Sequence, residues 1–162
     1  MNYPAFIENK IIENREELKN ILSVWRFKGE KVVFTNGCFD ILHRGHAEYL
    51  AQAASLGSKL VVGLNTDSSV RRLKGETRPV NNQYARALLL SSLLFTDKIV
   101  FFEEDTPLEL IRYIQPDVLV KGSDYKPEDI VGYDIVKSKG GEVITIDLTQ
   151  GYSTTSILHK LK

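Results

Sequence analysis

Two histidines three residues apart stand beside glycines in the segment Thr35-Asn36-Gly37-Cys38-Phe39-Asp40-Ile41-Leu42-His43-Arg44-Gly45-His46. The segment follows the apolar run 31–34, where a buried strand would end and a helix would begin. Glycine lets the backbone approach an anion, and the first turn of a helix presents unpaired N–H groups and the positive end of its dipole. Imidazole N–H groups can also donate hydrogen bonds to phosphate oxygens. This junction therefore predicts a phosphate-binding site.

Three further segments combine residues that could bind phosphate or sugar groups. Residues 71–79 hold four basic side chains and form a predicted cationic loop, although such a run is also typical of a solvated surface. Residues 120–125, Val-Lys-Gly-Ser-Asp-Tyr, could hold a ribose, a base edge or a sugar ring, or could be an ordinary turn after a strand. Residues 153–156 are Ser-Thr-Thr-Ser before an apolar helix, and four hydroxyls exceed what helix capping needs.

Together these segments resemble the nucleotidylyltransferase superfamily, in which a His-x-Gly-His element binds the phosphates of a nucleoside triphosphate. Within it, the chain most resembles the bacterial D-glycero-β-D-manno-heptose 1-phosphate adenylyltransferases, and the resemblance covers nearly the whole chain. It implies transfer of AMP from ATP to the heptose 1-phosphate, giving ADP-heptose and pyrophosphate, with Mg2+ accompanying ATP. It also implies a part in lipopolysaccharide core biosynthesis.

The resemblance implies a role for each matching residue. The predicted catalytic residues are His43, His46 and Lys74. The predicted nucleotide-binding residues are Thr35, Asn36, Gly37, Phe39, Asp40, His43, His46, Lys121, Gly122, Asp124, Ser153, Thr154 and Thr155. The candidates for binding the substrate phosphate are Lys74, Arg78 and Arg86, with a structural salt bridge as the alternative for Arg86. No metal ligand is assigned, although Asp40 could orient a phosphate or the metal.

Some positions bear on the choice of substrate. Ser123 stands where the heptose enzymes usually have glycine, and it would be strained if that position requires a positive φ. Leu148 and the pair 151–152 differ from the pattern of glycerol 3-phosphate cytidylyltransferases, which favours the heptose branch. Two alternatives stay open. One is a cytidylyltransferase acting on glycerol 3-phosphate or another sugar or alcohol phosphate, and the other is a non-catalytic nucleotide-binding module.

Composition bounds the remaining possibilities. The 162 residues, 43% of them hydrophobic, predict one domain over 1–162 with an N-terminal helical extension over 1–28. The 21 basic and 21 acidic side chains cancel, so neither nucleic acid nor a membrane surface is an expected partner. The single cysteine, Cys38, excludes an internal disulfide and is predicted to be a small buried hydrophobe. We expect a cytoplasmic protein, with a homodimer possible and a separate heptose kinase supplying the sugar phosphate.

The elements that must position these residues follow an alternating pattern. Apolar runs at 31–35, 59–64, 98–102, 117–121 and 142–146 predict five strands buried on both faces. Predicted helices cover 46–56, 84–94, 107–114 and 127–139. This alternation predicts an α/β fold, a Rossmann-like three-layer α/β/α arrangement of a five-stranded parallel sheet, for which the resemblance implies the order 3-2-1-4-5. Ligands then bind at the carboxyl ends of the strands.

The N-terminal extension has the marks of an amphipathic helix. Asn14 can cap it, and the stripe Leu18, Ile21, Leu22 and Trp25 lies along one face. We expect this stripe to pack on the domain, with an interface as the alternative. Near the other end, the isolated His159 is predicted to be a surface or satisfied core histidine.

Overall fold

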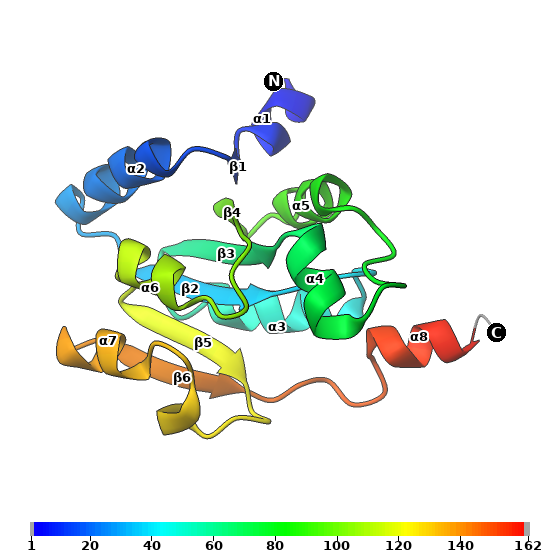
Figure 1. Cartoon of the computed structure of the whole chain (residues 1–162). Helices are drawn as coiled ribbons and strands as arrows, with labels where there is room; N and C mark the ends of the chain where they lie inside the picture. The colour runs from blue at the N-terminus through cyan, green and yellow to red at the C-terminus, as the bar shows by residue number, and fades with distance from the viewer. Residues whose placement is uncertain (1, 161–162) are drawn as a thin grey trace.

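The computed structural model describes residues 2–160, and a fully parallel sheet lies at its centre (Figure 1). In the order β1-β4-β3-β2-β5-β6, its strands are Ile11–Ile12, Lys98–Phe102, Lys59–Asn65, Val32–Gly37, Val118–Gly122 and Glu142–Ile146. The central strand β2 pairs with β3 on one side and β5 on the other, with Phe34 in register with both Val61 and Leu119. The carboxyl end of β2 therefore lies in the middle of one sheet edge.

The prediction of five strands was wrong, because the sheet has six. The additional strand β1 lies at the edge, where Ile11 pairs with Ile99 of β4. Two apolar residues between helical segments are too short a pattern to indicate a strand. They form a strand only because they pair with the edge of β4. The other five strands lie next to one another in the expected order when they are counted from β2.

Helices cover both faces of the sheet, which gives the three-layer arrangement. They are α1 (Tyr3–Glu8), α2 (Arg15–Phe27), α3 (Arg44–Ala54), α4 (Asp67–Lys74), α5 (Gln83–Ser91), α6 (Leu108–Ile114), α7 (Tyr133–Ser138) and α8 (Thr154–Lys160), with a 3-10 helix, η1, at Pro127–Asp129. Side chains of α2, α6 and α7 pack in one apolar core, and those of α3 and α5 pack in the other. No helix within residues 2–160 is both long and apolar enough to cross a membrane.

Two segments differ from their predicted conformation. Residues 127–139, expected as one helix, divide into η1 and α7 because Gly132 between them has a φ of +91°, outside the helical region. Residues 71–74, expected as part of a cationic loop, form the last turn of α4, which ends at Gly75 with a φ of +98°. The basic side chains of this turn are thus placed by a helix rather than by a loop.

The N-terminal extension packs on the domain as expected. Asn14 caps α2 by accepting a hydrogen bond from the N–H of Glu16 at 2.8 Å. Leu18 and Leu22 are buried, and the remaining two residues of the stripe are partly buried against the same core. The extension is not wholly helical, however, because it also contributes β1 to the sheet.

Candidate active site

A cavity of about 660 Å³ opens at the carboxyl edge of the sheet. It gathers most of the predicted site residues from segments far apart in the sequence. Those that line it are Asn36, Gly37, Phe39, Asp40, His43, His46, Lys74, Arg78, Lys121, Gly122, Asp124, Ser153, Thr154 and Thr155. Two predicted residues, Thr35 and Arg86, are not among the lining residues.

The two histidines form a stacked pair at the start of α3. His43 is the N-cap residue, and its Nδ1 accepts a hydrogen bond from the N–H of His46 at 3.4 Å. The ring centroids lie 3.7 Å apart with the planes 19° from parallel. A Cβ at Gly45 would lie 3.1 Å from the His43 ring, a tight contact that glycine avoids. Because His43 caps the helix, α3 begins at Arg44, earlier than predicted.

The loop that leads to this pair has an unusual backbone. Phe39 and Ile41 have φ angles of 45° and 53°, in the left-handed region that side chains larger than glycine seldom adopt. Each such residue costs on the order of 1–3 kcal/mol and persists only where its surroundings hold it. Strain of this kind clusters at functional sites, and here it falls between β2 and α3, immediately before the histidines.

Burial sets the protonation of both histidines. It lowers the pKa of His46 to about 4, with a further contribution from the charge of a protonated His43, and it also lowers the pKa of His43. Both imidazoles are therefore neutral at pH 7, and each has one N–H to donate. His46 Nδ1 is buried and has no hydrogen-bond partner within the described residues. A buried polar atom without a partner needs an explanation, and this one belongs to a side chain that lines the cavity.

The carboxylate of Asp40 is fully engaged by the protein. Its Oδ2 accepts hydrogen bonds from Arg78 Nε at 2.7 Å and the Val80 N–H at 2.8 Å, and its Oδ1 accepts from the Asn81 N–H at 3.0 Å. Burial alone would raise the pKa of Asp40, but the hydrogen bonds from Asn81, Val80 and Arg78 outweigh it and lower the pKa. Asp40 thus anchors the segment that carries Arg78 beside the cavity.

Arg86 is a buried structural residue in this fold. Its side chain has no exposed surface, and its NH2 group pairs with Asp67 at 2.8 Å. NH1 donates to the carbonyl oxygens of Cys38 and Asn65 at 2.7 and 2.9 Å, and Nε donates to that of Asn81 at 3.0 Å. This arrangement favours the salt-bridge alternative over binding of a substrate phosphate. The guanidinium joins the ends of β2 and β3 beneath the cavity.

Thr35 is a buried residue of β2 that lies outside the cavity lining. Its side chain is completely buried, and its Oγ1 lies 2.7 Å from the hydroxyl of Tyr49 on α3. This contact joins β2 to the helix that begins with the histidines. Thr35 is therefore a structural residue that fixes α3 relative to β2. The next residue, Asn36, lines the cavity.

Two lysines bring positive charge to the cavity. Lys74 is exposed at the end of α4, whereas Lys121 is partly buried at the end of β5. Lys121 Nζ donates to Asn36 Oδ1 at 3.2 Å and lies 5.7 Å from the centre of the Tyr125 ring. Burial lowers the pKa of Lys121. The two ammonium groups are candidates for contacting anions in the cavity.

The turn after β5 resolves the question about Ser123. A Cβ at Gly122 would lie 2.6 Å from Asp124 Oδ1, so glycine lets that carboxylate approach the backbone in its observed position. Ser123 is not among the residues with a positive φ, and its side chain is exposed. Replacing glycine by serine at position 123 therefore carries no left-handed backbone strain.

The three C-terminal hydroxyls have different environments. Ser153 Oγ accepts a hydrogen bond from the Ser156 N–H at 3.0 Å, so it caps α8. Thr154 Oγ1 donates to the carbonyl oxygen of Asp40 at 2.8 Å and docks the helix against the β2–α3 loop. Thr155 is exposed and lines the cavity. The start of α8 thus lines the same cavity as the histidines.

Sequence reasoning missed two groups of residues that line the cavity. One is Asp105, Thr106 and Pro107 after β4, and the other is Asp129, Ile130 and Val131 after β5. The available signal was topological, since segments that follow parallel strands lie at the carboxyl edge. Their carboxylates and hydroxyl could accept or donate hydrogen bonds to the hydroxyls of a sugar.

Cys38 also differs from its prediction, because it is half-buried and lines the cavity. Its Sγ lies 3.9 Å from Asn65 Oδ1. Burial raises the pKa of the thiol, which therefore stays protonated and weakly nucleophilic at neutral pH. The position gives no reason to assign covalent chemistry to Cys38.

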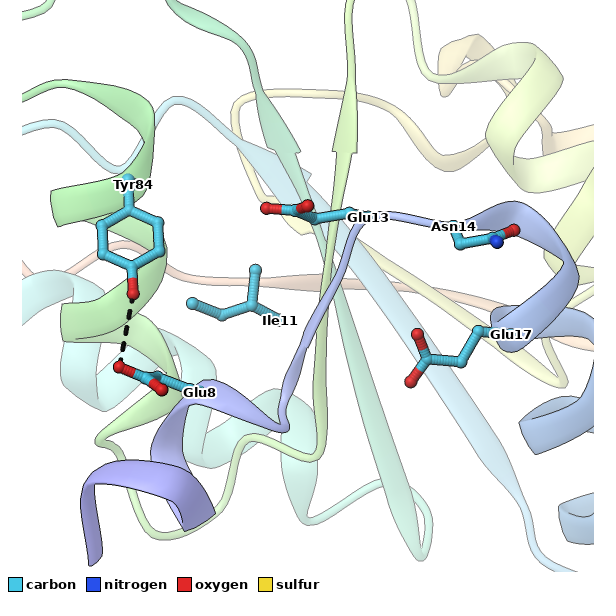
Figure 2. Close-up of a pocket in the computed structure, with 6 residues that line it drawn as sticks. All are labelled: Glu8, Ile11, Glu13, Asn14, Glu17 and Tyr84. Atoms are coloured by element: carbon cyan, nitrogen blue, oxygen red, sulfur yellow. Dashed lines mark hydrogen bonds between the residues drawn. The ribbon is translucent and has the colours of Figure 1, made fainter.

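A second, acidic pocket of about 420 Å³ lies at the N-terminal extension (Figure 2). Three glutamates from this extension surround it, and Tyr84 of α5 donates a hydrogen bond to Glu8 at 3.5 Å. Its negative charge is unsuited to phosphate. No group of three or more histidine, cysteine, aspartate or glutamate residues among residues 2–160 is arranged to hold a metal ion, in this pocket or elsewhere.

Comparison with known proteins shows which family this chain matches. Residues 34–160 match the family described as Cytidylyltransferase-like. The chain is 57% identical over 162 residues to "Bifunctional protein HldE" of Campylobacter concisus and 52% identical over 159 residues to that of Nitrobacter hamburgensis. These matches cover 99% and 97% of the chain but 33% and 32% of the relatives, so the chain spans about a third of their length.

Solved structures show a similar fold. The lipopolysaccharide core biosynthesis protein of Thermoplasma volcanium aligns with a TM-score of 0.61 and 29% identity, covering 77% of this chain and all of that one. The pantothenate synthetase of Thermus thermophilus aligns with a TM-score of 0.57 and 18% identity, covering 85% of this chain and 61% of that one. The second likeness concerns the fold alone.

Proposed function

The chain belongs to the cytidylyltransferase-like family of nucleotidyltransferases, and we propose that it transfers AMP from ATP to D-glycero-β-D-manno-heptose 1-phosphate. The observation that carries this proposal is the stacked pair of neutral histidines at the start of α3, which shares one cavity with Lys74, Lys121 and the start of α8. The heptose acceptor is supported by the resemblance of residues 73–79 and 120–125 to the heptose enzymes. It is also supported by the likeness to a protein described as acting in lipopolysaccharide core biosynthesis.

The proposed reaction is an in-line displacement at phosphorus. An oxygen of the sugar phosphate forms a bond to the α-phosphorus of ATP, and the bond from that phosphorus to the bridging oxygen breaks as pyrophosphate leaves. The attacking phosphate is already anionic at neutral pH, so no nucleophile from the protein is required. The protein must bring two anions together and stabilise the charge that grows on the leaving group.

The residues of the cavity have properties suited to these tasks. In our proposal, His43 and His46 donate N–H groups to the phosphates, and the free N–H groups at the start of α3 add further donors. Lys74 offsets negative charge, and Arg78, held by Asp40, offers its remaining N–H groups. Thr155 and the first turn of α8, which line the same cavity, contact the β- and γ-phosphates in this proposal.

We expect Mg2+ to enter with ATP as part of the substrate complex. Asp40, the one predicted candidate for orienting a metal, already accepts three hydrogen bonds from the protein. The site therefore suits a cation held mainly by phosphate oxygens and water, as Mg2+ commonly is. The acceptor must come from a sugar kinase reaction, and the curated relatives, which are about three times as long as the matched region, are described as bifunctional.

Pyrophosphate release from a panel of nucleotides tests the proposed function. With D-glycero-β-D-manno-heptose 1-phosphate as acceptor, we expect ATP to be used in preference to CTP, GTP and UTP. Glycerol 3-phosphate with each nucleotide is the control. A preference for CTP with glycerol 3-phosphate would overturn the heptose assignment, and ATP binding without pyrophosphate release in any pairing would indicate a non-catalytic module.

The double variant Thr154→Val/Thr155→Val tests the role of the C-terminal hydroxyls. It should worsen the ATP KM or the turnover at least about tenfold, because a hydrogen bond to a charged group contributes roughly 1.5–3 kcal/mol. The protein should still fold, since valine keeps the approximate shape of threonine and Ser153 still caps α8. The single variants separate docking by Thr154 from ligand binding by Thr155. If the ATP kinetics were unchanged and the melting temperature were lowered, the hydroxyls would have a purely structural role.

A further inference from the structure

The segment between β6 and α8 depends on side chains for its position. We call residues 147–153 the C-terminal linker; in Figure 1 it runs as an extended stretch from the end of β6 to α8. Among residues 2–160, no backbone–backbone hydrogen bond joins this linker to any element other than α8. The contacts that fix the linker therefore act together with the hydrogen bond from Thr154 to the carbonyl oxygen of Asp40 in positioning the hydroxyls of α8.

One carboxylate on α3 makes the central contact with the linker. Glu48 Oε2 accepts a hydrogen bond from Thr149 Oγ1 at 2.6 Å, and its Oε1 accepts from Arg44 Nε at 2.6 Å. Arg44 NH1 lies 3.4 Å from the hydroxyl of Tyr152, and the guanidinium is centred 5.1 Å from the Tyr152 ring. Glu48 is thus connected to both halves of the linker, directly through Thr149 and indirectly through Arg44.

The same helix carries this contact and the candidate catalytic pair. Arg44 and Glu48 are one turn apart on α3, which His43 caps. Both linker residues that they contact, Thr149 and Tyr152, line the cavity. The hydrogen bonds from Thr149 and Arg44 lower the pKa of Glu48, so the carboxylate is ionised at neutral pH and can accept both bonds.

We propose that Glu48 is a positioning residue that ties the C-terminal linker to α3 and so, together with the Thr154–Asp40 contact, holds the start of α8 at the cavity that the two histidines line. This inference rests on the proposed function for its consequence, since a correctly placed α8 matters for binding the triphosphate. Glu48 and Arg44 have side chains that are 37% and 60% exposed, and an exposed ion pair contributes little to global stability. The effect of Glu48 is therefore local to the linker and α8.

Limited digestion with chymotrypsin tests the contact on the ligand-free, full chain. Leu148 and Tyr152 are 54% and 44% exposed and are the two chymotrypsin sites in the linker. Glu48→Ala should speed cleavage there by about tenfold, because cleavage of a locally held segment follows its opening. Thr149→Val should do the same. The matched control is Glu142→Ala, which removes an exposed glutamate paired with Lys31 at 2.8 Å, away from the linker.

Steady-state kinetics then tests the consequence. Glu48→Ala should raise the ATP KM about five- to tenfold with little change in kcat, and the double variant Glu48→Ala/Thr149→Val should be no worse than the more affected single variant. Linker cleavage no faster than in Glu142→Ala would overturn the positioning role whatever the substrate is. Faster cleavage with an unchanged ATP KM would overturn its link to nucleotide binding. If the wild-type protein does not use ATP at all, faster cleavage still supports the contact, and only the proposed function fails.

Discussion

Replacing His46 with alanine is expected to lower kcat by about two to three orders of magnitude, the usual scale for losing one donor that stabilises charge in a transition state. The reason lies in the geometry of the pair. His46 is a neutral imidazole that lines the cavity and stacks on His43 with the ring centroids 3.7 Å apart, and its buried Nδ1 has no hydrogen-bond partner among residues 2–160. Single-turnover and steady-state measurements of pyrophosphate release would quantify the loss.

The His46→Ala protein should remain folded, because no hydrogen bond joins the His46 ring to another element within residues 2–160, and α3 keeps its cap at His43. Circular dichroism and thermal unfolding would show this. His159→Ala is the matched control, because His159 is exposed near the end of α8. This variant should keep the turnover of the wild-type protein. A folded His46→Ala protein with turnover near that of the control would refute the assignment of the histidine pair.

The second large effect is expected on stability rather than on turnover. Replacing Arg86 with methionine should lower the free energy of unfolding by about 3–5 kcal/mol, the range for removing one partner of a buried ion pair. The change deprives Asp67 of its ion-pair partner and the carbonyl oxygens of Cys38, Asn65 and Asn81 of their donor. In a chain of this size such a loss corresponds to a fall in melting temperature of roughly 6–20 °C.

Urea and thermal unfolding would measure this loss, with Arg71→Met as the control. Arg71 is an exposed arginine on α4, and surface substitutions of this kind usually change stability by less than about 0.5 kcal/mol. The opposite result would be an Arg86→Met protein with wild-type stability and a raised KM for the sugar phosphate. That result would restore the phosphate-binding role that the sequence had suggested for Arg86.

The comparison of these two residues shows which functional residues local sequence can reveal. The histidines were identifiable because their signal is local: a strand, glycines and a helix start follow one another within a few positions. Their spacing alone brings the two rings together at the first turn of α3. The parallel sheet was likewise predictable, since β2, β3, β4 and β5 are apolar runs that are largely buried on both faces. The run at 142–146 also forms a strand, but β6 lies at the sheet edge and is mostly only partly buried, which differs from the predicted burial on both faces.

Local sequence patterns could not predict the roles of three other polar residues, Arg86, Asp40 and Thr154. Their side chains are polar, and those of Arg86 and Thr154 are of a type that binds phosphate, but each is used by a protein partner distant in sequence. Arg86 donates to a carbonyl 48 residues away, Asp40 accepts from Arg78 at a separation of 38, and Thr154 docks on Asp40 at a separation of 114. A sequence shows that a side chain can donate or accept a hydrogen bond, but it does not show which partner the side chain will bond with in the folded protein.

By itself, the sequence determined the α/β class, the succession of the longer strands and the junction at which the histidine pair forms, because each depends on neighbours in the chain. Only the tertiary structure decided that β1 completes the sheet edge, that Asp105 and Asp129 reach the cavity, and that Glu48 holds the C-terminal linker. These outcomes depend on segments that meet only when the sheet assembles. Hydrogen bonding and burial act between neighbours in space, and the chain acquires those neighbours by folding.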